Sequence, residues 1–333
     1  MTHPTTPPRR QWLQTSLGLA LACALPGAAM AQASFPSKTL RIIVPYAPGG
    51  TTDIVGRRMG QRMSELLGQP VVIENRSGAN TGIGAELVAK ATPDGHTLLF
   101  TNDATFVANP VLYAKLPYNV QRDFTPVAAV TYVALALAVN TVTPVQNMRE
   151  LATYMRSRRD LSYGSFGAGS QSHLMGEMLK KLTGASDLVH VPYKGAGPAL
   201  TDVLGNQILL TFPAFPTLQG HLNGGKLKVL AVSGDKRVPL LPDVPTFTEA
   251  GFGELDMGAW YGFLAPAGTP KDVVDKLNAT INTILADRDF VEKQMTSQGM
   301  SAMGGTPEQM SALMRTETVR TAEYVKKSGA KAE

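Results

Sequence analysis

The sequence is poor in cysteine, histidine and charged residues. Among 333 residues it has one cysteine, Cys23, and five histidines, and only 17% of residues are charged. Cys23 lies in an N-terminal segment that we expect to be removed, so the remaining chain offers no disulfide bond, thiol chemistry or cysteine-ligated metal. His173 and Glu177, one helical turn apart, are too few to hold a metal ion. We therefore assign no metal site and no cofactor.

Clusters of positive charge are also missing. Lysine and arginine number 31 against 26 acidic residues, and residues 1–31 contain Arg9, Arg10 and no acid. Residues 32–333 therefore carry 29 basic against 26 acidic groups, a net charge of +3. A protein held on nucleic acid by phosphate neutralisation needs clustered basic side chains, whereas here they are dispersed. The sequence excludes nucleic acid as a partner.

Long apolar runs are absent after residue 31, where no stretch reaches the ~18 residues of a membrane span, so the protein is predicted not to be membrane-embedded. Residues 1–31 contain a short apolar stretch that follows Arg9-Arg10 and ends at Ala29-Met30-Ala31. This order is typical of an export signal peptide, and we expect cleavage after Ala31. The arginine pair leaves the general secretion and twin-arginine routes both open. The predicted location is the periplasm.

Short β-branched runs alternate with amphipathic segments through the rest of the chain. Such alternation predicts an α/β fold with mixed, mostly parallel sheets flanked by helices. The expected strands cover residues 40–44, 71–73, 97–100, 161–164, 189–191, 208–212, 227–232 and 260–264. The expected helices cover residues 53–67, 83–91 and 148–158, and three more begin after Ser170, after Thr269-Pro270 and at Pro307.

Two lobes are expected from the order of these elements. The apolar stretch 127–139 suits two successive strands that cross from one lobe to the other, and residues 260–264 suit a strand that returns. The first lobe then comprises residues 32–138 with 254–333, and the second comprises residues 139–253. Ligands of such sheets bind outside the carboxyl ends of the strands, so the strand-to-helix loops form the candidate site.

Six of these loops are rich in glycine and hydroxyl groups and poor in charge. Glycine lets peptide N–H groups approach an anion, and a helix that begins just after the loop adds free N–H donors. Loops of this kind can hold a carboxylate without an arginine. They span residues 46–52, 75–82, 101–103, 165–173, 193–197 and 212–215.

Several enzyme signatures are incomplete or absent in this sequence. Residues 220–226 have the spacing of a phosphate-binding loop, but Leu227 replaces the hydroxyl that binds magnesium and a strand is predicted to follow. No G-x-S-x-G nucleophile motif is present. Ser170 and His173 lie one helical turn apart without a third, orienting acid. We assign no catalytic residue, and a periplasmic serine hydrolase that uses Ser170 and His173 remains an alternative.

Several segments resemble a known family of receptors. The segments VPYAPGGTTD at 44–53, ENRSGA at 74–79, PDGHTL at 93–98, HVPYKG at 190–195 and LPDVPT at 241–246 are similar to the Bug-type substrate-binding receptors of tripartite tricarboxylate transporters. The resemblance implies a type II periplasmic binding-protein fold, a Venus flytrap whose two lobes close on a small organic acid. It also implies delivery of that acid to membrane permease subunits. A receptor that feeds a two-component sensor kinase is a second alternative.

The resemblance and the loop positions together give a set of predicted ligand contacts. Many relatives read Gly-Gly-Asn where this chain has Asn80-Thr81-Gly82, so a side chain at this point narrows or repolarises the pocket. The predicted contacts are Tyr46, Gly49, Gly50, Thr51, Asn80, Thr81, Thr101, Asn102, Phe166, Gly169, Ser170, His173, Tyr193, Gly195 and Phe215.

Overall fold

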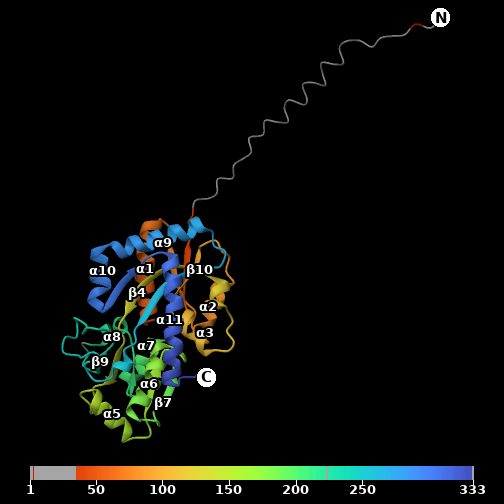
Figure 1. The fold of residues 1–333 in the computed structure, drawn as a ribbon. Coiled ribbons are helices and arrows are strands. Elements are labelled where there is room, and N and C mark those ends of the chain that lie inside the picture. The colour runs from red at the N-terminus through yellow and green to blue at the C-terminus, as the bar shows by residue number, and fades with distance from the viewer. Residues whose placement is uncertain (1–2, 4–34, 223, 332–333) are drawn as a thin grey trace. The chain divides into compact units, whose positions relative to one another are not determined.

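A computed structural model describes residue 3, residues 35–222 and residues 224–331. The predicted signal peptide and its cleavage point therefore lie outside the described residues, His3 excepted. The helices and strands belong to one compact unit that begins at Lys38 (Figure 1). None of the helices in the described ranges is both long enough and apolar enough to cross a membrane.

The first of two mixed sheets begins with β1, whose Ile42, Ile43 and Val44 are fully buried β-branched residues. Strands β1, β2 and β3 are parallel to one another, and β10 lies antiparallel between β3 and β4. Across the described residues the order in this sheet is β11-β4-β10-β3-β1-β2. The strands are β1 Leu40–Val44, β2 Val71–Asn75, β3 Thr97–Asn102, β4 Phe124–Val133, β10 Ala259–Pro266 and β11 Met300–Gly304.

The second sheet has the order β7-β6-β8-β5-β9 within the described chain. Strand β6 is parallel to β7 and β8, while β5 lies antiparallel between β8 and β9. Among the described strands, the second sheet therefore has one reversed strand, β5, whereas the first has two, β10 inside the sheet and β11 at its edge. The strands are β5 Ala136–Asn140, β6 Ser162–Ser165, β7 Val189–Pro192, β8 Leu210–Thr211 and β9 Leu227–Val232.

Helices flank both sheets, so the predicted α/β architecture of mixed sheets covered by helices is confirmed (Figure 1). Each sheet packs its apolar face into its own core, around Phe106 and Trp260 in the first and Leu200 and Phe215 in the second. The α-helices are α1 Thr51–Leu67, α2 Gly82–Ala89, α3 Asn109–Leu112, α4 Val120–Asp123, α5 Met148–Arg156, α6 Gln171–Thr183, α7 Ala196–Leu204, α8 Phe215–Leu222, α9 Lys271–Ala286, α10 Arg288–Gln294 and α11 Pro307–Ser328. The shorter helical turns are η1 Ala104–Ala108, η2 Gly253–Leu255 and η3 Thr296–Gln298.

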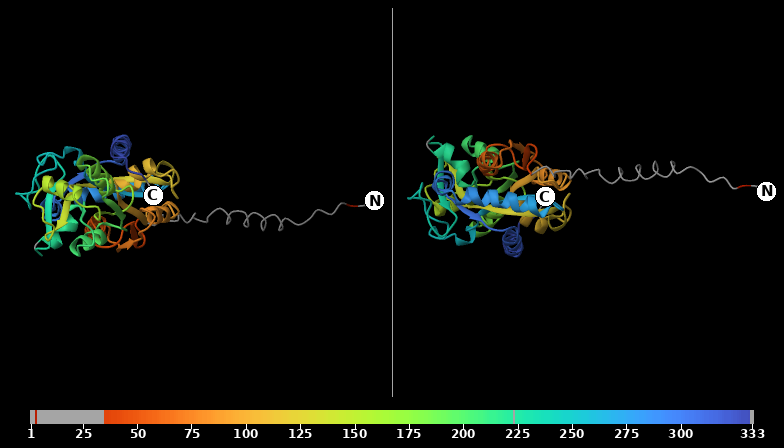
Figure 2. Two further views of the ribbon diagram at one scale, coloured as in Figure 1. Left: turned by 90° about the horizontal axis from the view of Figure 1, so that it is seen from below. Right: turned by 90° about the horizontal axis from the view of Figure 1, so that it is seen from above.

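The chain passes from the first sheet to the second between Val133 and Ala136, where β4 ends and β5 begins. It returns through β10, whose eight residues are all buried because the strand lies in the middle of its sheet. Helix α11 then lies along β4 and η1 and also contacts α6, so it touches elements that belong with both sheets (Figure 1). Figure 2 shows this helix, in dark blue, end-on. Lys181 Nζ in α6 donates to the Lys327 carbonyl in α11 at 2.8 Å.

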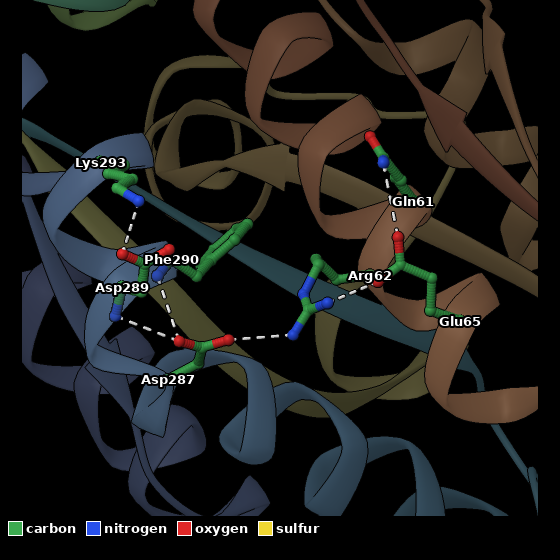
Figure 3. Close-up of polar contacts among 7 residues, drawn as sticks. All are labelled: Gln61, Arg62, Glu65, Asp287, Asp289, Phe290 and Lys293. Carbon is green, nitrogen blue, oxygen red and sulfur yellow. Dashed lines mark hydrogen bonds and ion pairs between the residues drawn. The ribbon is translucent and has the colours of Figure 1, made fainter.

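Helix α1 is fixed to the C-terminal segments by arginine side chains on its outer face. Arg62 Nη2 donates to Asp287 Oδ2 at 2.9 Å (Figure 3). Asp287 in turn caps α10, because its Oδ1 accepts from the Asp289 and Phe290 amides at 3.1 and 3.2 Å. Arg58 Nη1 donates to the Gln294 carbonyl at 2.8 Å. These bonds hold α1 in place, and its N-terminus faces the candidate site.

Candidate functional site

Three helices begin at one small cavity between the carboxyl ends of the two sets of strands. This inner cavity has a volume of about 10 Å³. Helix α1 contributes Thr51 and Thr52 at its start, α7 contributes its first residue Ala196, and Ala214 immediately precedes α8. The first four N–H groups of a helix have no acceptor within it, and the helix dipole is positive at this end. The lining is Tyr46, Gly50, Thr51, Thr52, Asn102, Phe166, Ala196, Ala214 and Tyr261.

A larger outer cavity of about 410 Å³ adjoins the inner one, since Tyr46 and Phe166 line both. Its ionisable side chains other than tyrosine are Lys115 and Lys194, and its described lining includes no carboxylate. The size lies within the range of small-molecule sites. The lining is Pro45, Tyr46, Gly78, Ala79, Asn80, Thr81, Tyr113, Lys115, Leu116, Pro117, Phe166, Gly167, Ala168, Pro192, Tyr193 and Lys194.

Asp53 and Asn75 shape the glycine-rich loop after β1. Asp53 Oδ2 accepts from the Gly49 amide at 3.1 Å, and its Oδ1 accepts from Asn75 Nδ2 at 3.0 Å. Asn75 Nδ2 also donates to the Tyr46 carbonyl at 3.1 Å. The Gly49 amide is thus used inside the loop. The buried Asp53 therefore holds the backbone of this loop in place and is not assigned as a ligand contact.

Two tyrosine hydroxyls at the inner cavity are kept protonated by burial. Tyr46 Oη donates to Asn102 Oδ1 at 2.7 Å. Burial raises the pKa of Tyr46 well above its usual value. Burial likewise raises the pKa of Tyr261, which is hydrogen-bonded to Thr51. The inner cavity is therefore lined by neutral groups and helix N-termini.

The two lobes are joined directly around the cavities by bonds between elements of the two sheets. Gln171 in the first turn of α6 donates through Nε2 to the buried carboxylate of Asp103, which follows β3. Burial raises the pKa of Asp103 well above its usual value. Further bonds across the lobes include Ala47 N to Lys194 O at 2.8 Å, Thr51 Oγ1 to Thr217 Oγ1 at 2.9 Å and Tyr113 Oη to Ala168 O at 3.1 Å.

The structure brings most of the predicted contact residues to these cavities. Gly195 lies beside them, because it stands in the chain between Lys194 of the outer cavity and Ala196 of the inner one. Gly49 stands next to Gly50 in the same loop, although its N–H group is committed to Asp53. The predicted residues that line one or both cavities are Tyr46, Gly50, Thr51, Asn80, Thr81, Asn102, Phe166 and Tyr193.

Gly49 and Gly195 line neither cavity themselves, and five further predicted residues also line neither in the described part of the chain. Thr101 is buried and its Oγ1 lies 2.6 Å from Thr105 Oγ1. Phe215 packs in the core of the second lobe, because α8 turns its first side chain inward. Gly169 lies behind Asn80 of the outer cavity, since a Cβ there would be 3.2 Å from Asn80 Nδ2. Ser170 and His173 are the other two.

Ser170 and His173 form the N-terminal cap of α6. Ser170 Oγ donates to the Gly167 carbonyl at 2.6 Å, and His173 Nδ1 accepts from the Gly169 amide at 2.9 Å. Ser170 is fully buried. The serine proton and Nδ1 of the imidazole therefore face backbone groups and not each other. This arrangement does not resemble a nucleophile and its base.

The ring of His173 stacks on His190, with centroids 4.1 Å apart. Tyr163 also stacks on His190, with centroids 5.0 Å apart, and Ser165 Oγ lies 2.7 Å from His190 Nε2. Among the described residues, no group of three or more His, Cys, Asp or Glu side chains is placed to hold a metal ion. The histidine pair therefore serves as packing at the base of α6.

Acidification is expected to destabilise the protein through His190. Burial lowers the pKa of His190 from 6.5 to about 4, with the nearby Lys180 lowering it further and Glu177 raising it. The unfolded chain then binds a proton that the folded chain does not, so this contribution to stability is complete above pH 6.5 and declines as the pH falls toward 4. We expect His190→Gln to flatten the fall in melting temperature between pH 7 and pH 4.5. An unchanged slope in the variant would contradict this role.

Several cavity residues were missed by sequence reasoning. Lys194 lies in one of the predicted loops, but a lysine in a loop is usually exposed, so the sequence does not indicate that it contacts a ligand. Lys115 and Tyr113 follow η1 and α3, which have no clear periodicity in the sequence. Thr217 lines neither cavity, but it lies inside α8 and its bond to Thr51 arises only from the docking of that helix against α1.

Comparison with known proteins gives one family. A family model described as "Tripartite tricarboxylate transporter family receptor" matches residues 55–330. BugT of Bordetella pertussis is 33% identical over 317 residues, which cover 95% of this chain and 97% of that protein. The similarity therefore extends over nearly the full length of both proteins.

Solved structures agree with this comparison. A structure of an R. palustris protein with adipate is 34% identical and has a TM-score of 0.86, with 90% of this chain and 100% of that chain covered. The structure of MatC from Rhodopseudomonas palustris with bound malate is 35% identical with a TM-score of 0.81, covering 87% and 100% of the two chains. The predicted two-lobed binding-protein fold and the resemblance to Bug-type receptors are confirmed. This chain belongs to the family of tripartite tricarboxylate transporter receptors.

Proposed function

We propose that the protein is a periplasmic receptor that captures a small organic carboxylate between its lobes and delivers it to the permease subunits of a tripartite transporter. The observation that carries this proposal is the convergence of the N-terminal ends of α1, α7 and α8 at the inner cavity, which α8 reaches through Ala214, the residue just before it. Free N–H groups at helix N-termini bind anions without a positively charged side chain. The bound adipate and malate of the two R. palustris structures are carboxylates of this kind.

The outer cavity is proposed to receive the remainder of the ligand. Lys115 and Lys194 favour a second negative group there, and the rings of Tyr46, Phe166 and Tyr193 offer apolar surface to a carbon chain. An acid with two carboxylates then has one end at the peptide N–H groups and the other near the lysines. The proposed contacts are Tyr46, Gly50, Thr51, Asn80, Thr81, Asn102, Phe166, Tyr193 and Gly195.

Closure of the lobes is proposed to be the output of binding. The lobes are residues 32–138 with 254–333 and residues 139–253, and the sheets support this division except that β5 already begins at Ala136. A ligand that touches both lobes binds the closed state more tightly than the open one, and only this difference shifts the population. The export signal predicted over residues 1–31 and the receptor family support the periplasm as the site of action.

A thermal-shift panel of mono-, di- and tricarboxylates tests the proposal. At 100 times its dissociation constant, a ligand stabilises the folded state by about 2.7 kcal/mol, which raises the melting temperature of a chain of this size by several degrees. We expect at least one acid to do so and the corresponding amide or alcohol to have no effect. A panel in which no carboxylate shifts the melting temperature would contradict the proposed function.

A further inference from the structure

The side chain of Asn80 extends from the first lobe into a turn of the second. A Cβ built on Gly167 would lie 2.3 Å from Asn80 Oδ1, and one built on Gly169 would lie 3.2 Å from Asn80 Nδ2. Both glycines have positive φ, +137° and +87°. The turn therefore leaves the space that this amide fills, and Asn80 also lines the outer cavity.

The backbone at Asn80 is held in an unusual conformation. Ala79, Asn80 and Thr81 have φ of +46°, +42° and +72°, in the left-handed region that favours glycine. Asn109 Nδ2 donates to the Asn80 carbonyl at 2.8 Å and to Thr81 Oγ1 at 3.2 Å, which holds the segment in place. Strain of this kind persists where the surrounding structure fixes it and is a sign of function.

A chain of hydrogen bonds fixes which way the Asn80 amide faces. Tyr118 Oη donates to the Thr105 carbonyl at 2.6 Å, so it accepts from Asn109 Nδ2 at 3.1 Å. Asn109 must then present its Oδ1 to Asn80, whose Nδ2 donates to it at 2.5 Å. The Oδ1 atom of Asn80 consequently faces away from Asn109, toward the second lobe.

Asn80 Oδ1 is buried and has no hydrogen-bond partner among the described residues. Nearby donors are committed elsewhere. The Gly167 amide donates to Ser165 Oγ at 3.2 Å and the Gly169 amide to His173 Nδ1 at 2.9 Å. The hydroxyl of Tyr113 donates to the Ala168 carbonyl. A buried acceptor without a donor is costly, so the closed arrangement favours a guest that supplies one.

We propose that Asn80 selects, among small carboxylates, those that also carry a hydrogen-bond donor such as a hydroxyl or ammonium group. The inference rests on the proposed function, because it assumes a carboxylate in the adjoining cavities. A donor on the ligand satisfies Oδ1 when the lobes close, whereas a plain alkyl acid leaves it unpaired. The side chain thus acts on the choice of ligand and leaves the capture of the carboxylate to the peptide N–H groups.

Isothermal titration with matched acids tests this inference on the mature chain. The pairs are succinate with malate and glutarate with glutamate, each differing by one hydroxyl or ammonium group. For the wild type, we expect the donor-bearing member of at least one pair to bind about tenfold more tightly. In Asn80→Gly, which suits the positive φ and removes Oδ1, we expect that ratio to fall to near one. Asn80→Ala provides the same test if the glycine variant is unstable.

Asn206→Gly is the matched control, because Asn206 also has a positive φ, +54°, and lines neither cavity among the described residues. It should keep the wild-type ratio. Equal affinities within both pairs for the wild type, or an unchanged ratio in Asn80→Gly, would overturn the selection by Asn80 and leave the carboxylate receptor intact. If no acid binds the wild type, the proposed function itself fails.

Discussion

Gly50→Asp is expected to weaken carboxylate binding at least a hundredfold without unfolding the protein. Gly50 is the N-cap of α1 and lines the inner cavity. Its φ of −84° and ψ of 169° suit any residue, and a Cβ there meets the Ala196 amide at an ordinary 3.7 Å. An aspartate at this position accepts from the first-turn N–H groups and repels the ligand, by roughly 4 kcal/mol at 4 Å and an effective dielectric constant of 20.

Two variants separate charge from shape at this position. Gly50→Ala adds only the Cβ, and Gly50→Asn has the shape and capping ability of aspartate without its charge. Titration should rank the affinities as wild type and alanine first, asparagine next and aspartate last. The melting temperature of the aspartate variant should equal or exceed that of the wild type, because aspartate is a good N-cap. Wild-type affinity in Gly50→Asp would show that the anion binds elsewhere.

Gly176→Ala is expected to destabilise the folded protein by about 3 kcal/mol, at the upper end of the cost of overpacking a core. A Cβ on Gly176, inside α6, would lie 2.0 to 2.6 Å from three atoms of the Tyr163 ring. That ring is fully buried, its hydroxyl donates to Glu177 Oε1 at 2.8 Å, and it stacks on His190. The ring therefore has little freedom to move aside.

Gly220→Ala is the matched control for this substitution. It lies in α8 with no atom within 4 Å of the added Cβ. Alanine should stabilise that helix by about 0.5–1 kcal/mol through helix propensity alone. Urea unfolding of both variants measures the difference. Equal stabilities would mean that Tyr163 is not held as tightly as its contacts indicate.

Most elements of the fold could be predicted because they bury apolar residues at the period of a strand or a helix. Residues 40–44 and 227–232 are strands in the structure as the apolar runs indicate, and residues 127–139 contain the end of β4 and most of β5. The helix after Pro270 and the helix from Pro307 begin where their start signals lie. In each case the information is local, since caps, turns and periodicity act over a few residues.

Other elements could not be predicted because their stability comes from distant partners. Strand β11, Met300–Gly304, contains Ala302 and Gly304 and has little β propensity. It forms because it pairs antiparallel with β4. The segment of η1 and α3 is stabilised by packing on β3 and α11. These contacts join residues far apart in the chain, which no local pattern encodes.

Part of the candidate site, like part of the fold, could be predicted from the sequence. The sequence by itself determined that glycine-rich loops follow the strands and that Tyr46, Gly50, Thr51 and Phe166 belong to them, because turn chemistry and the strand-to-helix order are local. Only the tertiary structure decided that Ser170 and His173 cap α6 inside the protein, since a helix start can face either the cavity or the core. It also decided that Asn80 enters the glycine turn of the opposite lobe. The direction of a side chain is set by the packing of elements against each other, and that packing exists only in the folded chain.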